Sequence, residues 1–122
     1  MSRTVLQPGP QHPITVEPAA ARITVTAGGT PVADTTAALA LQEAKYPTVY
    51  YIPLADVRSD VLKPSDHTIY CPYKGDASYY SIATAEGELT DAVWYYPEPY
   101  SAVADIAGHV AFYADKVDIT AT

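Results

Sequence analysis

The sequence has little of what disulfide frameworks and metal centres require. It contains one cysteine and three histidines among 122 residues. A single thiol cannot form an internal disulfide, and it falls short of the three or four ligands that a zinc site usually takes. The one E-x-E pattern, residues 86–88, lies in a predicted solvated turn. We therefore expect no bound metal and a free thiol, which suits the reducing cytoplasm.

Positive charge is scarce as well. Seven Lys and Arg residues stand against 14 Asp and Glu residues, so the formal net charge is -7. The seven cations are scattered singly along the chain and form no basic surface for a phosphate backbone or an anionic lipid. No apolar run approaches the roughly 20 residues of a membrane span. We expect a cytoplasmic protein without nucleic-acid or membrane partners, while self-association as a homo-oligomer stays open.

Glycine is limited to six residues, and only Gly28 and Gly29 are adjacent. The phosphate-binding patterns G-x-x-x-x-G-K and G-x-G-x-x-G are both absent, and so is the nucleophile pattern G-x-S-x-G. The sequence therefore shows no phosphate cradle made of backbone amides and no motif of a serine hydrolase. We expect no cofactor, and whether the protein is an enzyme stays open.

Proline and tyrosine are abundant, with eleven residues of each against one Phe and one Trp. Pro8, Pro10 and Pro13 remove backbone donors near the N-terminus, so we expect residues 1–18 to form an arm, laid on the surface or disordered, ahead of a single domain over residues 19–122. Tyrosine suits half-buried sheet faces and pocket walls, although it also serves as an ordinary strand residue. The composition favours a sheet-rich domain with an aromatic cavity.

Alternating and β-branched runs predict most of the strands. A hairpin is expected over residues 22–33, with Gly28 and Gly29 in its turn, and a further strand over residues 49–52. Residues 77–82 and 89–96 should pair antiparallel, and residues 110–112 and 117–119 suggest two closing strands. Residues 34–44 fit either a helix or a strand, and local propensity favours helix. The apolar spacing of residues 54–62 predicts a short helix, which makes the domain mainly β with one or two short helices.

Reactive groups are densest in residues 65–80, which read SDHTIYCPYKGDASYY. Pro72 forces Cys71 into an extended conformation and sets up a turn that ends at Gly75. Lys74 is then displayed at a rigid turn, where it either holds an anionic group of a ligand or is simply solvated. His67 and Cys71 suggest a nucleophile pair, but four residues of straight strand span about 13 Å, whereas a nucleophile and its base must lie about 3 Å apart. A lone cysteine between β-branched and aromatic neighbours is more often a small core residue, and Cys71 fits that description.

Several motifs in a fixed order carry a resemblance to a known family. They are Tyr50–Pro53, Ser65–Thr68, Cys71–Gly75, Asp91–Trp94 and Ile106–Gly108. Over roughly residues 20–120 the chain resembles the family catalogued as domain of unknown function 427. The resemblance implies a compact, mostly antiparallel domain similar to the β-tent fold, and it favours strand over helix for residues 36–42. Zinc knuckles of β-tent relatives need more cysteines than this chain has. The family is sometimes labelled nucleotidyltransferase, yet no carboxylate pair that would hold magnesium is evident here.

Two functional interpretations follow. The first is a module that binds an unidentified small polar or anionic molecule in an aromatic-walled pocket, or an enzyme that uses the same pocket for an unassigned reaction. The second is a structural or protein-interaction domain, in which the tyrosines form core and partner surface. The candidate ligand-binding residues of the first interpretation are Arg58, His67, Cys71, Lys74, Tyr80, Trp94, Tyr96 and Glu98.

Overall fold

The computed structural model describes residues 3–122, which form ten β-strands and three short 3₁₀ helices. The strands are β1 (Ile14–Pro18), β2 (Ile23–Ala27), β3 (Thr30–Thr35), β4 (Leu39–Glu43), β5 (Val49–Pro53), β6 (Leu62–Cys71), β7 (Gly75–Thr84), β8 (Gly87–Tyr95), β9 (His109–Phe112) and β10 (Asp118–Ala121). The helices are η1 (Leu54–Asp56), η2 (Ser59–Val61) and η3 (Ser101–Ile106). None of these helices is long and apolar enough to cross a membrane.

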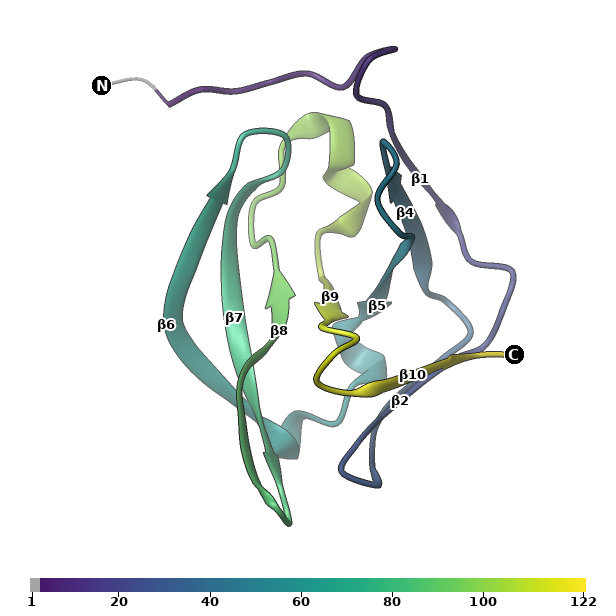
Figure 1. Ribbon diagram of the computed structural model, residues 1–122, viewed down its shortest axis with the longest axis vertical. Helices are drawn as coiled ribbons and strands as arrows, with labels where there is room; N and C mark the ends of the chain where they lie inside the picture. Colours follow the sequence, from purple (N-terminus) through teal and green to yellow (C-terminus); the bar gives the residue numbers. More distant parts are fainter. Residues whose placement is uncertain (1–2) are drawn as a thin grey trace.

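The strands make two antiparallel sheets (Figure 1). The larger sheet has seven strands in the order β1-β4-β5-β9-β8-β7-β6, and the smaller has the order β10-β2-β3. Every strand pair between neighbours in these sheets is antiparallel. The mainly β, antiparallel domain expected from the sequence is confirmed.

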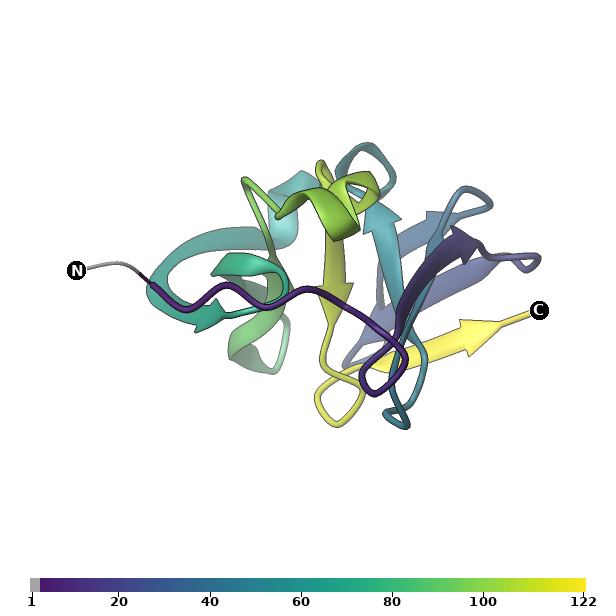
Figure 2. The same cartoon turned by 90° about the horizontal axis from the view of Figure 1, so that it is seen from above.

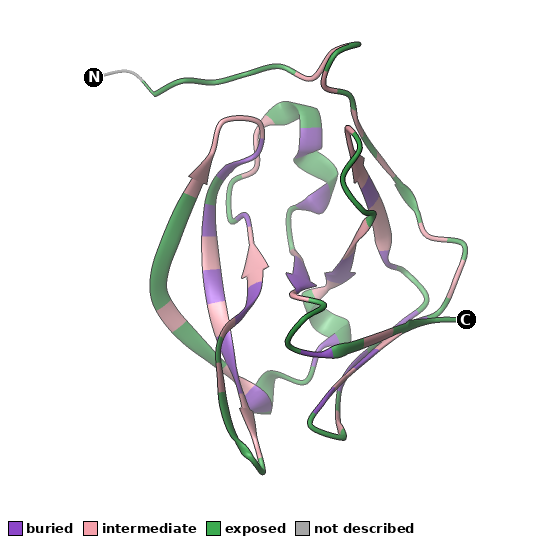
Figure 3. Cartoon of the chain, in the orientation of Figure 1, coloured by how far each residue is buried: buried purple, intermediate pink, exposed green. Residues whose placement is uncertain are grey.

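The two faces of the larger sheet bury different side chains, because successive residues of a strand point to opposite sides. Ile52 and Val93 belong to a cluster that packs against the smaller sheet, together with Val25 and Phe112. Their neighbours Tyr51 and Trp94 belong to a second, aromatic cluster, which η3 covers with Val103 and Ile106. Figure 3 shows buried positions concentrated on the central strands, while the edge strand β6 is largely exposed. The aromatic cluster holds the candidate site.

Most predicted strands are confirmed, and one helical prediction is corrected. For residues 34–44, where local propensity favours helix and the family resemblance favours strand, the strand is confirmed. Residues 39–43 form β4, because Leu39 pairs with Tyr51 of β5 and Leu41 is buried in the aromatic cluster. Long-range pairing here overrides the weak local helix propensity. Residues 54–62 form η1 and η2, two single 3₁₀ turns, and β6 then runs through Pro64. An edge strand tolerates Pro64 because its outer amides need no partner.

Strand β1 lies within the residues expected to form the N-terminal arm. Ile14–Pro18 pairs with β4 and so extends the larger sheet at one edge. The preceding residues cross the turn between β6 and β7, where the Leu6 amide donates to the Pro72 carbonyl over 3.0 Å. Arg3 forms two hydrogen bonds to Asp76 beyond that turn, at 2.7 and 2.5 Å. In Figure 2, which views the molecule from above, this arm passes over the end of the β6–β7 hairpin, so it lies on the surface.

Gly75 should be the least replaceable glycine of the fold. Its φ is +113°, and an added Cβ would lie 3.2 Å from the Glu98 carbonyl oxygen. We expect Gly75→Ala to lower the free energy of unfolding by about 2 to 4 kcal/mol, measured by urea denaturation. Gly29→Ala is the control, because Gly29 has a positive φ of +80° but open space around the added Cβ. Equal losses for both variants would show that the close approach to Glu98 does not matter.

Candidate functional site

A cavity of about 430 Å³ lies on the aromatic face of the larger sheet. The sheet is curled, so that β4 near one end approaches the β6–β7 turn at the other, and the cavity opens between them. Its walls are formed by six aromatic side chains: Tyr46, Tyr51, Tyr79, Trp94, Tyr96 and Tyr113. Glu43 and Lys74 are its two charged lining residues. An aromatic enclosure with few polar groups is the usual composition of a small-molecule site.

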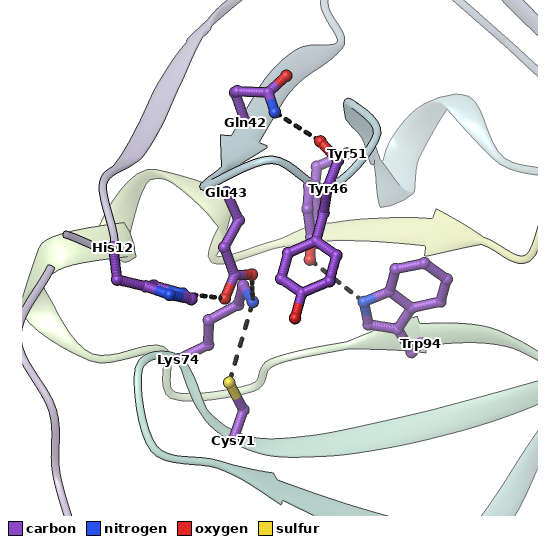
Figure 4. A network of polar contacts seen from close by, with 8 residues as sticks. All are labelled: His12, Gln42, Glu43, Tyr46, Tyr51, Cys71, Lys74 and Trp94. Atoms are coloured by element: carbon purple, nitrogen blue, oxygen red, sulfur yellow. Dashed lines mark hydrogen bonds and ion pairs between the residues drawn. The ribbon is translucent and has the colours of Figure 1, made fainter.

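The charged end of the cavity is a cluster of three side chains (Figure 4). The Lys74 ammonium donates to Oε1 of Glu43, and Nε2 of His12 lies 2.8 Å from the other carboxylate oxygen. The His12 ring stacks on Tyr73, with ring centroids 4.2 Å apart. We call Lys74, Glu43 and His12 the charged cluster. It joins the N-terminal arm, the end of β4 and the β6–β7 turn.

Lys74 is therefore placed differently from the sequence-based expectation. The residue is only 8% exposed, so it is neither displayed on the surface nor simply solvated. The turn itself is as predicted, with the Lys74 amide donating to the Cys71 carbonyl over 3.2 Å. The expectation failed because the partner, Glu43, lies 31 residues away in the sequence and is brought close only by the curl of the sheet.

Glu43 is held in its ionised form. Burial by itself raises the pKa of this carboxyl, but the hydrogen bonds from Lys74 and His12 outweigh the burial and leave the pKa below its usual value. A carboxylate that accepts charge-assisted hydrogen bonds on both oxygens is stabilised in the charged form. Both carboxylate oxygens are thus engaged within the protein.

Three buried phenols of the cavity, those of Tyr51, Tyr79 and Tyr96, are held in the neutral form. Burial raises the pKa of Tyr51, Tyr79 and Tyr96 well above the ordinary value for tyrosine. Tyr51 accepts a hydrogen bond from the Trp94 indole over 3.2 Å, and the two rings meet edge to face with centroids 6.4 Å apart. Neutral phenols act as hydrogen-bond donors and acceptors, not as bases.

Four of the candidate residues from the sequence lie together. Lys74, Trp94 and Tyr96 line the cavity. Cys71 packs against the same aromatic cluster, and its sulfur is 3.9 Å from the Lys74 nitrogen. The motif Cys71–Gly75 and the end of β8 therefore meet at one site.

The other four candidates lie elsewhere. His67 borders a neighbouring hollow that shares the Tyr79 and Tyr113 walls of the cavity. Tyr80 stacks on Tyr95 on the opposite face of the sheet, with centroids 4.8 Å apart. The remaining two sit at separate surfaces, Arg58 paired with Asp60 and Glu98 in a small hollow beside Arg3.

The structure does not assemble a nucleophile and base from Cys71. His67 lies in the bulge of β6 and contacts the Tyr79 ring, with centroids 4.7 Å apart. His109, the third histidine of the chain, is engaged elsewhere, because its Nδ1 lies 2.9 Å from the Ala107 carbonyl oxygen. Within residues 3–122, Lys74 is the only side chain in hydrogen-bonding range of Cys71, and no three His, Cys, Asp or Glu side chains are grouped to hold a metal ion.

Sequence reasoning missed six aromatic or charged residues of the site: His12, Glu43, Tyr46, Tyr51, Tyr79 and Tyr113. Tyr51 and Tyr79 each sit in a run of two adjacent tyrosines, where either residue fits the buried face, and the register between strands decides which one does. For Tyr79 the one signal in the sequence is the strand alternation around Trp94, because Tyr79 pairs with Trp94 across β7 and β8. For His12 and Glu43 no local signal exists.

Removing the lysine should destabilise the protein. Lys74→Met leaves the Glu43 carboxylate part-buried with only His12 as a partner, so we expect a loss of about 2 to 4 kcal/mol in free energy of unfolding. Lys63→Met is the control, because Lys63 is exposed and 3.9 Å from Glu88, and it should cost less than about 0.5 kcal/mol. The loss should shrink in a Glu43→Gln background. Unchanged stability of Lys74→Met would show that the ion pair contributes nothing.

Acid should weaken the charged cluster through Glu43. Because its folded-state pKa is lowered, the ionised carboxylate stabilises the fold above the unfolded-state pKa of about 4.3. That contribution is lost as pH falls through the lower folded-state pKa. We expect the stability difference between wild type and Glu43→Gln to shrink as pH falls from 6 to 3, measured by urea denaturation. Glu17→Gln, on the exposed side of β1, should follow the wild-type curve, and a difference that grows toward acid would contradict the prediction.

Residues 15–122 match the family model described as Domain of unknown function (DUF427). No curated protein matches the chain. The matched residues include every strand that lines the cavity as well as the Cys71–Gly75 turn, whereas His12 and the residues before it precede them. This match covers most of the sequence, so the chain belongs to the DUF427 family.

Proposed function

We propose that this domain binds a small molecule in the aromatic cavity. Three features support the proposal: the size of the cavity, its aromatic walls and the presence of a few polar groups at one end. A volume of about 430 Å³ lies within the common range of ligand sites, roughly 300 to 1,000 Å³. The ligand would stack against Trp94 and Tyr113, whose rings lie 4.5 Å apart at their centroids.

The observation that carries the proposal is the hydroxyl of Tyr96. Tyr96 is only 7% exposed, yet within residues 3–122 its hydroxyl has no hydrogen-bond partner. No polar side-chain atom of these residues is both sealed from solvent and unpaired, so the hydroxyl faces the cavity. A ligand that covers this hydroxyl would bury it at a cost in free energy unless the ligand itself forms a hydrogen bond to it. A ligand in the cavity would supply that bond.

Binding is better supported than catalysis. An acid–base or nucleophilic mechanism needs a reactive group with a free lone pair or a suitable pKa. Here Glu43 is engaged by Lys74 and His12, and the phenols of Tyr51 and Tyr96 are held neutral. The groups around the cavity are arranged to hold a molecule. We therefore favour a binding module over an enzyme.

The protein-interaction alternative has little support. Within the described residues, the large exposed apolar side chains are scattered over separate segments of the sequence.

Trp94 offers a direct test, because it is the only tryptophan in the sequence and lines the cavity. We expect a library of small ring compounds to contain members that change Trp94 fluorescence and raise the melting temperature. Tyr96→Phe should weaken those compounds several-fold, because it removes one donor from the cavity. Tyr95→Phe is the control, since Tyr95 stacks on Tyr80 on the opposite face. A library without any compound that alters Trp94 fluorescence, or hits that are equally weakened by both variants, would contradict the proposal.

A further inference from the structure

The hydrogen-bonding capacity left unused in the cavity is one-sided. Its strongest acceptor, the Glu43 carboxylate, is occupied by Lys74 on one oxygen and His12 on the other. The oxygen of Tyr51 accepts from the Trp94 indole. Tyr79 and Tyr113 lie hydroxyl to hydroxyl at 3.3 Å and so engage each other. Within residues 3–122, neutral phenol oxygens such as that of Tyr96 remain open to a donating ligand, but the one charged acceptor that lines the cavity is already engaged on both oxygens.

Several hydrogen-bond donors that line the cavity have no strong acceptor within the described residues. Tyr51 accepts from Trp94, but within residues 3–122 its own O–H has no acceptor, and the O–H of Tyr96 has none either. The Lys74 ammonium carries three N–H groups. One donates to Glu43, and one points toward the Cys71 sulfur at 3.9 Å, which is a weak contact. At least one N–H remains, so three donors on three different elements are available to a ligand.

Protonation states reinforce this asymmetry. The pKa values of Tyr51 and Tyr96 are raised by burial, so both phenols keep their protons at neutral pH and remain able to donate. Lys74 cannot accept a hydrogen bond under any circumstances while it is charged. A ligand group that only donates would be left with neutral phenol oxygens, such as that of Tyr96, as its open acceptors, and a cationic group would also be repelled by the ammonium of Lys74.

We propose that the ligand of this cavity is a planar molecule that presents an acceptor oxygen, a carboxylate or a carbonyl, to Tyr51, Tyr96 and Lys74. The inference rests on the proposed binding function and assigns its ligand class. Planarity follows from the walls, because six aromatic side chains, Trp94 and Tyr113 among them, line the cavity, and a flat ring packs well against aromatic side chains. The oxygen end lies at the charged cluster, and the ring lies between the aromatic walls.

Three probes of nearly the same shape test the ligand class. Benzoate carries an anionic acceptor group, benzamide a neutral carbonyl, and benzamidine a cationic group that only donates. Each is titrated into the full chain, and binding is followed by Trp94 fluorescence and by the indole N–H signal of Trp94 in a nitrogen–proton correlation spectrum. We expect benzoate to bind most tightly, benzamide more weakly and benzamidine most weakly. Tyr96→Phe should weaken benzoate about five-fold, the value of one hydrogen bond, whereas Tyr95→Phe should leave it unchanged.

The outcomes separate the ligand class from the binding function. Benzoate binding that is strongest of the three and weakened only by Tyr96→Phe supports the inference, and the benzoate-to-benzamide ratio reports whether charge or the carbonyl oxygen dominates. Benzamidine binding as tight as benzoate, with a response of Trp94, overturns the acceptor-oxygen class and leaves the binding function standing. Failure of benzoate and benzamide alike to perturb Trp94 also overturns the class, and the binding function is then judged by the ring-compound library alone.

Discussion

The ion pair between Lys74 and Glu43 is the contact on which the candidate site depends. Glu43 ends β4 near one end of the seven-stranded sheet, and Lys74 lies in the turn between the two strands at the other end. Three strands, β5, β9 and β8, separate β4 from β7 in the sheet, so the pair forms only if the sheet is strongly curled. Sheet twist makes such a curl available, and the ion pair holds it at one distance. The cavity is the space that this curl encloses.

The charged cluster also explains why the fold tolerates Lys74, a lysine that is only 8% exposed. A part-buried charge is costly alone, but here the ammonium, the carboxylate and the imidazole of His12 satisfy one another. The arm supplies His12 and is itself held by Arg3 on Asp76 and by Leu6 on Pro72. Because the family match begins at residue 15, this third member of the cluster comes from outside the matched region. The arm thus completes the charged end of a cavity whose remaining walls belong to the family domain.

The aromatic walls of the cavity come from one face of the larger sheet. Two-residue alternation sends Tyr51, Tyr79 and Trp94 to one face and Ile52, Tyr80 and Val93 to the other. The second face is an ordinary apolar core against the small sheet, and it provides the burial that stabilises the fold. The first face is aromatic and incompletely filled. One sheet therefore separates an apolar core from the aromatic face that lines the cavity.

The sequence by itself determined the class of fold, most of the strands and the neighbourhood of the site. Those features follow from local rules: β-branched and aromatic alternation, glycine and proline in turns, and the Cys71–Gly75 motif. Only the tertiary structure decided that Lys74 is buried and that Tyr79 faces the cavity instead of Tyr80. Each of these depends on strand register or on a partner tens of residues away, such as Glu43 for Lys74. Local sequence carries no record of such partners, because the free energy that selects them arises only when the strands pair and the sheet curls.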